Sequence, residues 1–134
     1  MAIQSLKISK LYKDLDLAFT ANPVTGDVSK KIDVNAVKQS LKTLILTNYW
    51  ERPFQPEKGG NLRGLLFEPI SPLIANTLTK VIEQLIVSYE KRVRLTQIRA
   101  IPAIDDNGYD LSIYYYVIGI DKPQVFNTNL ERLR

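Results

Sequence analysis

Hydrophobic positions recur with a helical period in two stretches of the chain. Apolar residues three or four apart predict an amphipathic helix over residues 34–48, with Asp33 as its N-cap. The same spacing predicts a second helix over residues 72–89. Ser71 and Pro72 mark its start, because a proline at the first helical position loses no hydrogen bond. Each helix therefore has one apolar face that must pack against another element.

The period changes to that of a strand in the C-terminal third of the chain. Strands are predicted over residues 92–104 and 109–120, joined by a turn whose Asn107-Gly108 pair accepts positive φ angles. The second strand carries three consecutive tyrosines, 114–116, and is apolar or aromatic on both faces, which predicts that both faces are covered. Residues 121–134 are polar, and we expect a loose tail or a partner-binding arm there.

The N-terminal third is less regular. We expect residues 1–14 to form an extended arm or a short helix. Leu15, Leu17 and Phe19 alternate with other residues as in a half-buried strand, and the turn-forming residues 22–27 complete a hairpin over residues 15–32. Asn61 is expected to cap a short helical turn at 62–67. The predicted fold class is α+β: two main amphipathic helices packed on a small mixed or antiparallel β-sheet with a long C-terminal hairpin.

Composition removes several kinds of chemistry. The chain has 134 residues, 18 Lys and Arg against 14 Asp and Glu, and neither histidine nor cysteine. Ser-His-Asp and Cys-His nucleophiles, thiolate zinc sites and imidazole proton transfer are therefore excluded. No cofactor or metal site is predicted, because phosphate-loop and metal-ligand spacings are missing from the sequence. We expect one domain over residues 1–134, soluble and unsecreted, since no apolar run approaches a membrane span.

Residues 49–60, which we call the Pro/Gly loop, contain Pro53, Pro56, Gly59 and Gly60 and end regular structure, and within them residues 51–60 are the most unusual local sequence. Prolines limit φ and glycines allow backbone conformations that other residues resist, so such a loop holds a fixed shape. One interpretation is a rigid docking surface. The other is a scaffold loop in which Phe54 fills the core while Glu51 and Arg52 are solvated.

Carboxylates are the available acid and base groups. Glu51, Glu57 and Glu68 lie close in sequence, and Leu65–Phe67 could give Glu68 an apolar setting. A glycosidase needs two carboxyl groups roughly 5–9.5 Å apart beside a sugar cleft. The simpler interpretation is that Glu68 pairs with a nearby arginine such as Arg52 or Arg63.

A basic cluster precedes the C-terminal hairpin. It consists of Lys91, Arg92, Arg94 and Arg99. On a strand, Arg92 and Arg94 would point to the same face and could bind phosphates or a partner's carboxylates. The alternative is an ordinary solvated strand face. The basic residues are not concentrated as in a nucleic-acid-binding domain, so nucleic acid is not an expected partner.

Several motifs match a known family together. The densest is Arg52-Pro53-Phe54-Gln55-Pro56-Glu57-Lys58-Gly59, followed by Leu62 and Leu66-Phe67-Glu68. Others are Leu11–Asp16, Pro72, Tyr89, Ile101-Pro102 and Asp105-Asp106. In these motifs the chain resembles the gene 25-like small baseplate wedge proteins of contractile-tailed phages, which are related to a subunit of the type VI secretion baseplate.

One motif departs from the family. The family's Glu-Pro-Arg motif, at the end of the long helix, here reads Glu90-Lys91-Arg92, so the charged positions match and the proline does not. The resemblance therefore covers the charge pair but not the rigid turn that the proline would impose. By resemblance, Glu90 and Arg92 belong to a feature of the fold that is shared with the polymerising domain of the sheath protein.

The resemblance implies a structural protein, not an enzyme, of the virion tail baseplate, assembled in the host cytoplasm. Its implied partners are other baseplate wedge proteins and the tail sheath protein, with no membrane and no small-molecule substrate. The hypothesis is that the outer edge of the 92–120 hairpin accepts sheath strands by β-strand addition, with Arg92 and Arg94 meeting acidic partner groups. The candidate partner-binding residues are Arg52, Phe54, Glu90, Arg92 and Arg94. Because the family has carried a lysozyme label, the alternative is a peptidoglycan-cleaving, lysozyme-like glycosidase using glutamate carboxylates.

Overall fold

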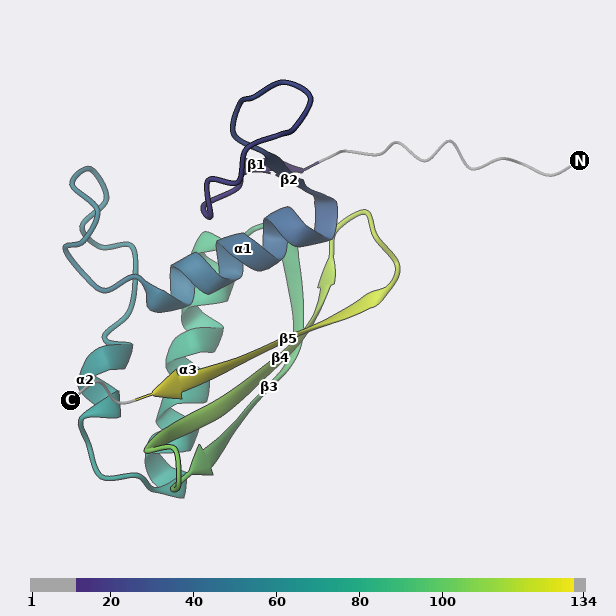
Figure 1. Ribbon diagram of the computed structural model, residues 1–134. Coiled ribbons are helices and arrows are strands. Elements are labelled where there is room, and N and C mark those ends of the chain that lie inside the picture. The colour runs from purple at the N-terminus through teal and green to yellow at the C-terminus, as the bar shows by residue number, and fades with distance from the viewer. Residues whose placement is uncertain (1–11, 132–134) are drawn as a thin grey trace, which may run out of the picture.

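The computed structural model describes residues 12–131 (Figure 1). Its elements are β1 (Lys13–Leu15), β2 (Lys30–Ile32), α1 (Asp33–Leu46), α2 (Leu62–Leu66), α3 (Pro72–Tyr89), β3 (Val93–Ala103), β4 (Gly108–Val117) and β5 (Pro123–Glu131). The α+β class predicted from the sequence is confirmed. Most of the expected arm, residues 1–14, lies outside the described residues.

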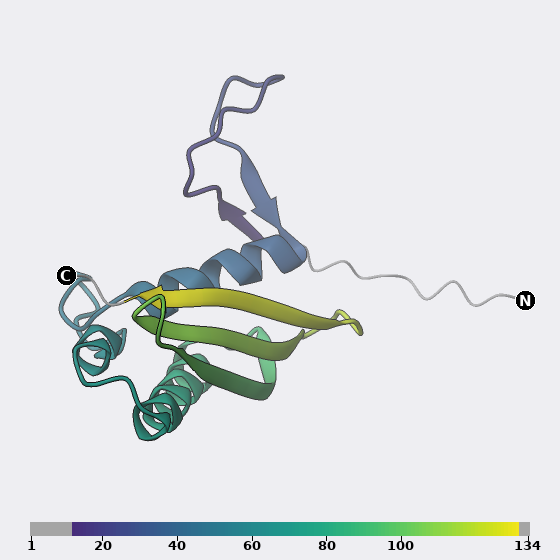
Figure 2. The same ribbon diagram turned by 60° about the horizontal axis from the view of Figure 1, so that its bottom comes forward.

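The core lies between two helices and one face of a three-stranded sheet. In Figures 1 and 2, α1 and α3 lie on the same side of the strands β3, β4 and β5. Val37, Leu41 and Ile45 of α1 join the apolar residues of α3 and of the sheet in one buried cluster. The helical spacing read from the sequence therefore marks the faces that are buried.

The two helix starts differ. At α3 the Ser71 side chain accepts a hydrogen bond from the Ile74 N–H at 3.3 Å, and Pro72 occupies the first turn, as predicted. The prediction that Asp33 caps α1 is wrong. Ile32 holds the cap position, and no side chain makes a capping hydrogen bond there. Asp33 has a φ of 49° and its N–H donates to the Tyr12 carbonyl at 2.7 Å, so its backbone is bound to the segment before β1.

The C-terminal sheet has the strand order β3-β4-β5. The predicted hairpin of β3 and β4 is confirmed, with Ala103 opposite Gly108 beside the turn. The expectation of a loose tail from 121 is wrong for the described part, because residues 123–131 form β5 and pair with β4 along its length. Phe126 and Leu130 of β5 are buried in the core, which is the physical reason that this polar segment is ordered.

The strand β4 is buried on one face. Tyr109, Leu111, Ile113, Tyr115 and Val117 point into the core. On the opposite face Asp110 and Tyr116 are exposed, so the prediction that both faces are covered is wrong. The helices pack on the inner face, and no described element lies over the outer one (Figure 2).

A separate two-stranded hairpin, β1 with β2, projects from the start of α1 (Figure 1). We call residues 13–32 the N-terminal hairpin. The predicted hairpin exists, but its strands are short, and the prediction of a half-buried strand over residues 15–19 is wrong. Leu15, Leu17 and Phe19 are exposed, whereas Asp16 is buried. The chain leaves the strand after Leu15, and Asp16 is held by the Ala18 N–H and by Lys31.

Between residues 12 and 131, no helix is long and apolar enough to cross a membrane. In the same range, no three side chains of the metal-ligating types come together as a group.

Candidate functional site

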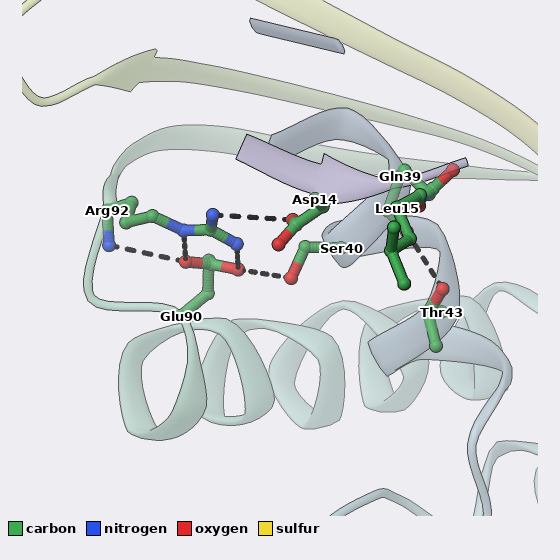
Figure 3. Close-up of polar contacts among 7 residues, drawn as sticks. All are labelled: Asp14, Leu15, Gln39, Ser40, Thr43, Glu90 and Arg92. Carbon is green, nitrogen blue, oxygen red and sulfur yellow. Dashed lines mark hydrogen bonds and ion pairs between the residues drawn. The ribbon is translucent and has the colours of Figure 1, made fainter. Parts of the chain in front are cut away.

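A two-point ion pair joins Glu90 and Arg92 at the turn between α3 and β3. The Arg92 Nε lies 2.8 Å from Glu90 Oε1, and Nη2 lies 3.1 Å from Oε2 (Figure 3). The Arg92 N–H also donates to Oε1 at 3.3 Å, and the Ser40 hydroxyl of α1 donates to Oε2 at 2.6 Å. The Glu90 carboxylate therefore accepts hydrogen bonds from the turn and from α1.

Both charges of this pair are stabilised in place. The Glu90 side chain is buried, and this burial alone would raise its pKa. The hydrogen bonds from Arg92 and Ser40 and the positive charge of Arg92 outweigh burial, so the pKa of Glu90 lies below its ordinary value. The hydrogen bond to Glu90 raises the pKa of Arg92 against its partial burial, and the charges of Glu90 and Asp14 add to this. The carboxylate is thus held ionised.

Arg92 also fixes the N-terminal hairpin to the body of the protein. Its Nη1 lies 3.5 Å from Asp14 Oδ2 of β1, and its guanidinium lies 5.5 Å from the centre of the Tyr12 ring. The Tyr12 hydroxyl donates to the Ile118 carbonyl at 3.0 Å. Two parts of the chain that are far apart in sequence, the start of the N-terminal hairpin and the turn after α3, therefore meet at one guanidinium, as Figure 3 shows for Asp14, Glu90 and Arg92.

Gln39 of α1 provides a second attachment for the hairpin. Its Nε2 donates to the Leu15 carbonyl at 2.7 Å, and its Oε1 accepts from the Leu17 N–H at 3.2 Å. The side-chain amide thus bonds to the backbone as a neighbouring strand would. The hairpin is held at the Arg92 side and along α1.

The Pro/Gly loop is held in a fixed shape by its own backbone. Trp50 N–H donates to the Pro56 carbonyl at 2.9 Å, which closes the loop on itself. The Gly60 N–H donates to the Thr47 carbonyl at 3.2 Å, and the Tyr89 hydroxyl of α3 donates to the Glu57 carbonyl at 2.9 Å. A loop bound at both ends and in its middle keeps one conformation with little ordering left for a partner to impose.

Glu51 and Gly59 complete this loop. The Glu51 carboxylate accepts from the Asn48 backbone and side chain, both at 3.0 Å, and these bonds hold the pKa of Glu51 below its ordinary value. Gly59 has a φ of 136°, and a Cβ there would lie 2.6 Å from the Thr47 carbonyl oxygen. The position therefore requires glycine.

The aromatic residues of the Pro/Gly loop point to solvent. Phe54 is 98% exposed and Trp50 is 82% exposed. The interpretation in which Phe54 fills the core is therefore wrong, because the loop turns that side chain outward. Aromatic residues on a rigid loop are typical of the anchors of protein interfaces.

A cleft of about 510 Å³ lies between the N-terminal hairpin and the Pro/Gly loop, and we call it the hairpin–loop cleft. Its charged lining residues are Lys13, Asp14, Arg52, Lys58, Glu90 and Arg92. Its floor is the side of α1 that carries Gln39, Ser40 and Thr43, part of which appears in Figure 3. Three of the predicted partner-binding residues, Arg52, Glu90 and Arg92, therefore share one site.

Arg94 lies elsewhere. The strand β3 begins at Val93, so Arg92 belongs to the preceding turn, and the prediction that Arg92 and Arg94 share a strand face is wrong. Arg94 is opposite Tyr116 on the outer face of the sheet and lines a separate hollow there with Ile118 and Asp121. Arg92 is already paired within the chain, whereas Arg94 is exposed.

The candidate acid and base residues are dispersed. Glu57 and Glu68 are exposed, so Glu68 is not buried in an apolar setting. Across the described range, Glu68 also forms no ion pair with Arg52 or Arg63, so that interpretation is wrong as well. The carboxylates that line the hairpin–loop cleft are Asp14 and Glu90, both bound to Arg92.

Local sequence patterns miss four residues of this site. Tyr12, Asp14, Gln39 and Ser40 contact Arg92, Glu90 or the hairpin backbone through tertiary packing. The motif at residues 11–16, which includes Tyr12 and Asp14, was a signal for two of them. Nothing in helix periodicity distinguishes Ser40 from another polar residue of α1.

Comparison with protein families gives a match over residues 33–120 to the model described as baseplate wedge protein gp25. A curated relative, the baseplate wedge protein gp25 of Enterobacteria phage T4, is 36% identical over 111 residues. That alignment covers 83% of this chain and 83% of the T4 protein.

Solved structures share the fold. A chain of the anti-feeding prophage baseplate has a TM-score of 0.64 at 23% identity, covering 92% of this chain and 88% of that one. A chain of the pyocin R2 baseplate after contraction has a TM-score of 0.58 at 20% identity, covering 73% and 96%. A putative tail lysozyme from Geobacter sulfurreducens has a TM-score of 0.60 at 18% identity, covering 71% and 88%. At these identities the likeness extends to the fold alone.

Proposed function

This chain belongs to the baseplate wedge protein gp25 family, and we propose that it docks to other wedge proteins and nucleates the tail sheath by β-strand addition. In this proposal the chain is a structural component of a contractile-tail baseplate, and the baseplate is assembled in the host cytoplasm. The T4 relative, a baseplate wedge protein, supports the baseplate role. The observation that carries the strand-addition role is the open edge of β5.

The outer edge of β5 is suited to accept another strand. β5 lies at one side of the sheet, and in the described part of the chain no strand pairs with its outer edge. Its register with β4 runs from Gly108 opposite Glu131 to Tyr116 opposite Pro123 without a shift. Proline occurs only at its first position, so the strand offers a regular row of N–H and C=O groups.

The edge of β3 is less suited to this role. Its register shifts between Leu95 and Gln97, which marks a bulge, and Pro102 has no N–H. Bulges and prolines are the means by which proteins prevent pairing at a sheet edge. The sequence hypothesis named the outer edge of the 92–120 hairpin, but β5 covers one side of that hairpin and β3 forms the other. We therefore assign the acceptor edge to β5.

Docking to wedge proteins is assigned to the Pro/Gly loop. Phe54 and Trp50 are exposed on a loop whose backbone is fixed, and Arg52 lies on the same loop at the hairpin–loop cleft. Arginine and aromatic side chains supply much of the binding energy in protein interfaces. A preformed loop also loses little conformational entropy when a partner binds.

Proline substitutions in β5 test strand addition. Along an edge strand, N–H groups point alternately toward the neighbouring strand and toward solvent. Of the adjacent variants Asn127→Pro and Thr128→Pro, one removes an outward N–H and the other removes an N–H that bonds to β4. The variant with the outward loss keeps its hydrogen bonds to β4, so it is recognised by its higher stability in thermal unfolding. That variant, co-expressed with candidate sheath and wedge proteins, is expected to give no ordered sheath rings by electron microscopy.

The matched control is Thr96→Pro, at the bulge of the β3 edge, which should leave ring formation intact. Normal sheath growth on the folded β5 variant would contradict the proposal.

An alanine substitution in the Pro/Gly loop tests docking. Phe54→Ala should reduce co-purification of wedge proteins, while Phe19→Ala, which removes an exposed aromatic of the N-terminal hairpin, should not.

The glycosidase alternative has less support. A general acid needs a raised pKa, whereas the pKa of Glu90 is lowered and its carboxylate is bound to Arg92. Glu57 and Glu68 are exposed, and neither lines the hairpin–loop cleft. Purified protein tested on peptidoglycan beside Glu57→Gln and Glu68→Gln decides the question. Hydrolysis that is lost in either variant would favour the enzyme, and inert protein that binds baseplate partners would favour assembly.

A further inference from the structure

The hairpin–loop cleft carries positive charge that the chain itself does not neutralise. Its lining includes four basic and two acidic side chains. Both carboxylates, Asp14 and Glu90, are bound to Arg92. Among residues 12–131, Lys13, Arg52 and Lys58 form no ion pair, although the Lys58 Nζ lies 5.9 Å from the centre of the Tyr89 ring. The cleft therefore has an excess of positive charge arranged on both of its walls.

Apolar groups accompany these charges. Leu15 and Leu17 of the N-terminal hairpin line the cleft and are exposed. The hydroxyl-bearing Ser40 and Thr43 of the floor already donate hydrogen bonds to Glu90 and to the Gln39 carbonyl. A ligand with both carboxylates and aliphatic groups would use this lining, whereas a simple anion would leave the leucines exposed to water.

Both walls are held in place before any ligand binds. The Pro/Gly loop is fixed by the bond from the Tyr89 hydroxyl to the Glu57 carbonyl, beside Lys58. The hairpin is fixed by Asp14 on Arg92 and by Gln39 on the Leu15 backbone. Cations on fixed walls lose little freedom on binding, which favours a defined partner over diffuse attraction.

We infer that the hairpin–loop cleft binds an acidic segment of a partner protein, with aliphatic side chains among its carboxylates. Arg52 takes one carboxylate through its planar fork, Lys13 and Lys58 face others, and Leu15 and Leu17 contact the aliphatic side chains. The inference rests on the proposed docking function, since it names the chemistry of a docking partner. It concerns a surface separate from the β5 edge.

Peptide titration of the full chain tests the inference. The probe is a fluorescein-labelled pentapeptide with leucine between two pairs of glutamates, and its matched control has glutamine in place of each glutamate. The acidic probe is expected to bind saturably and the glutamine peptide not to bind. Arg52→Gln should weaken binding about tenfold, the effect of one charge-assisted hydrogen-bonded contact. Arg99→Gln, which removes an exposed arginine from β3, should leave the affinity unchanged.

Three outcomes would overturn the inference. One is no saturable binding of the acidic probe, and another is equal weakening by Arg52→Gln and Arg99→Gln, which would indicate diffuse attraction. The third is displacement of the probe by inorganic phosphate or a short oligonucleotide with the same dependence on Arg52, which would make this a phosphate site. The titration uses the isolated chain and a peptide probe, so its failure is distinct from failure of the docking proposal, which is tested by co-purification of wedge proteins with Phe54→Ala.

Discussion

Glu90 and Arg92 form a two-point ion pair, with 2.8 Å from Nε to Oε1 and 3.1 Å from Nη2 to Oε2. The pair closes the turn between α3 and β3, and the same guanidinium reaches Asp14 of the N-terminal hairpin. The same interaction thus fixes the end of α3, the start of β3 and the position of the N-terminal hairpin, which is one wall of the hairpin–loop cleft.

Removing the charge of Glu90 should destabilise the protein. Glu90→Gln is expected to lower the free energy of unfolding by about 3 kcal/mol, because Arg92 loses a buried counter-charge. Chemical denaturation of the two proteins measures the difference. Glu83→Gln, at an exposed position of α3, is the control and should have little effect. A loss as small as that of the control would contradict the structural role of the pair.

The same pair should make stability depend on pH at the acidic end. The pKa of Glu90 in the folded protein is below its ordinary value of 4.5, so the unfolded chain takes up the proton first as pH falls. The contribution of Glu90 is therefore complete above about pH 5 and is lost as pH falls through the folded-state pKa. Urea unfolding between pH 7 and 3 should show the gap between wild type and Glu90→Gln narrowing below pH 4.5. A constant gap would be inconsistent with this assignment.

Restoring the family proline should be tolerated. Glu90 has φ −109° and ψ 93°, an extended conformation that is allowed before proline. Within the described residues the Lys91 backbone N–H donates no hydrogen bond, so the variant loses only the exposed bond of 3.2 Å from the Lys91 Nζ to the Val87 carbonyl. Lys91→Pro is expected to raise the free energy of unfolding by about 0.5 kcal/mol, by restricting the unfolded chain. Destabilisation beyond 1 kcal/mol would show that this chain forms its turn differently.

The shape of the Pro/Gly loop depends on Gly59. Gly59→Ala should lower the free energy of unfolding by about 2 kcal/mol or more, because the Cβ meets the Thr47 carbonyl oxygen and φ is positive. Gly26→Ala is the control: its φ is also positive, but nothing lies within 4 Å of the added Cβ. Thermal unfolding compares the two variants, and a smaller loss for Gly59→Ala than for Gly26→Ala would contradict the close contact.

The helices and the β3–β4 hairpin could be predicted because their signals are local. Apolar spacing defines α1 and α3, and Asn107-Gly108 defines the turn. The strand β5 was missed, although Phe126 and Leu130 alternate with polar residues, because Asn127 and Asn129 gave the segment the composition of a tail. The opposite error occurs at Leu15, Leu17 and Phe19, where a strand was predicted and the chain does not continue as one. They have the alternation of a strand, but Phe19 adopts a φ of 54° and the chain turns away.

The candidate site could be predicted only in part. Glu90, Arg92 and Arg52 were identified through the family motifs, and the structure places them at one cleft. Ser40 and Asp14 complete the ion pair from positions 50 and 78 residues away in sequence. The motif at residues 11–16 was a signal for Asp14, but no local pattern reveals Ser40. Arg94 was grouped with Arg92 by strand alternation, which fails because Arg92 lies before β3 begins.

Hydrogen–deuterium exchange of the chain, alone and bound to sheath protein, tests the central claim most directly. Strand addition protects backbone N–H groups that otherwise face solvent. The account predicts slower exchange in β5, over residues 123–131, and unchanged exchange in β3 at its bulged edge. Protection of β3 with β5 unchanged, or binding without protection of either strand, would contradict it.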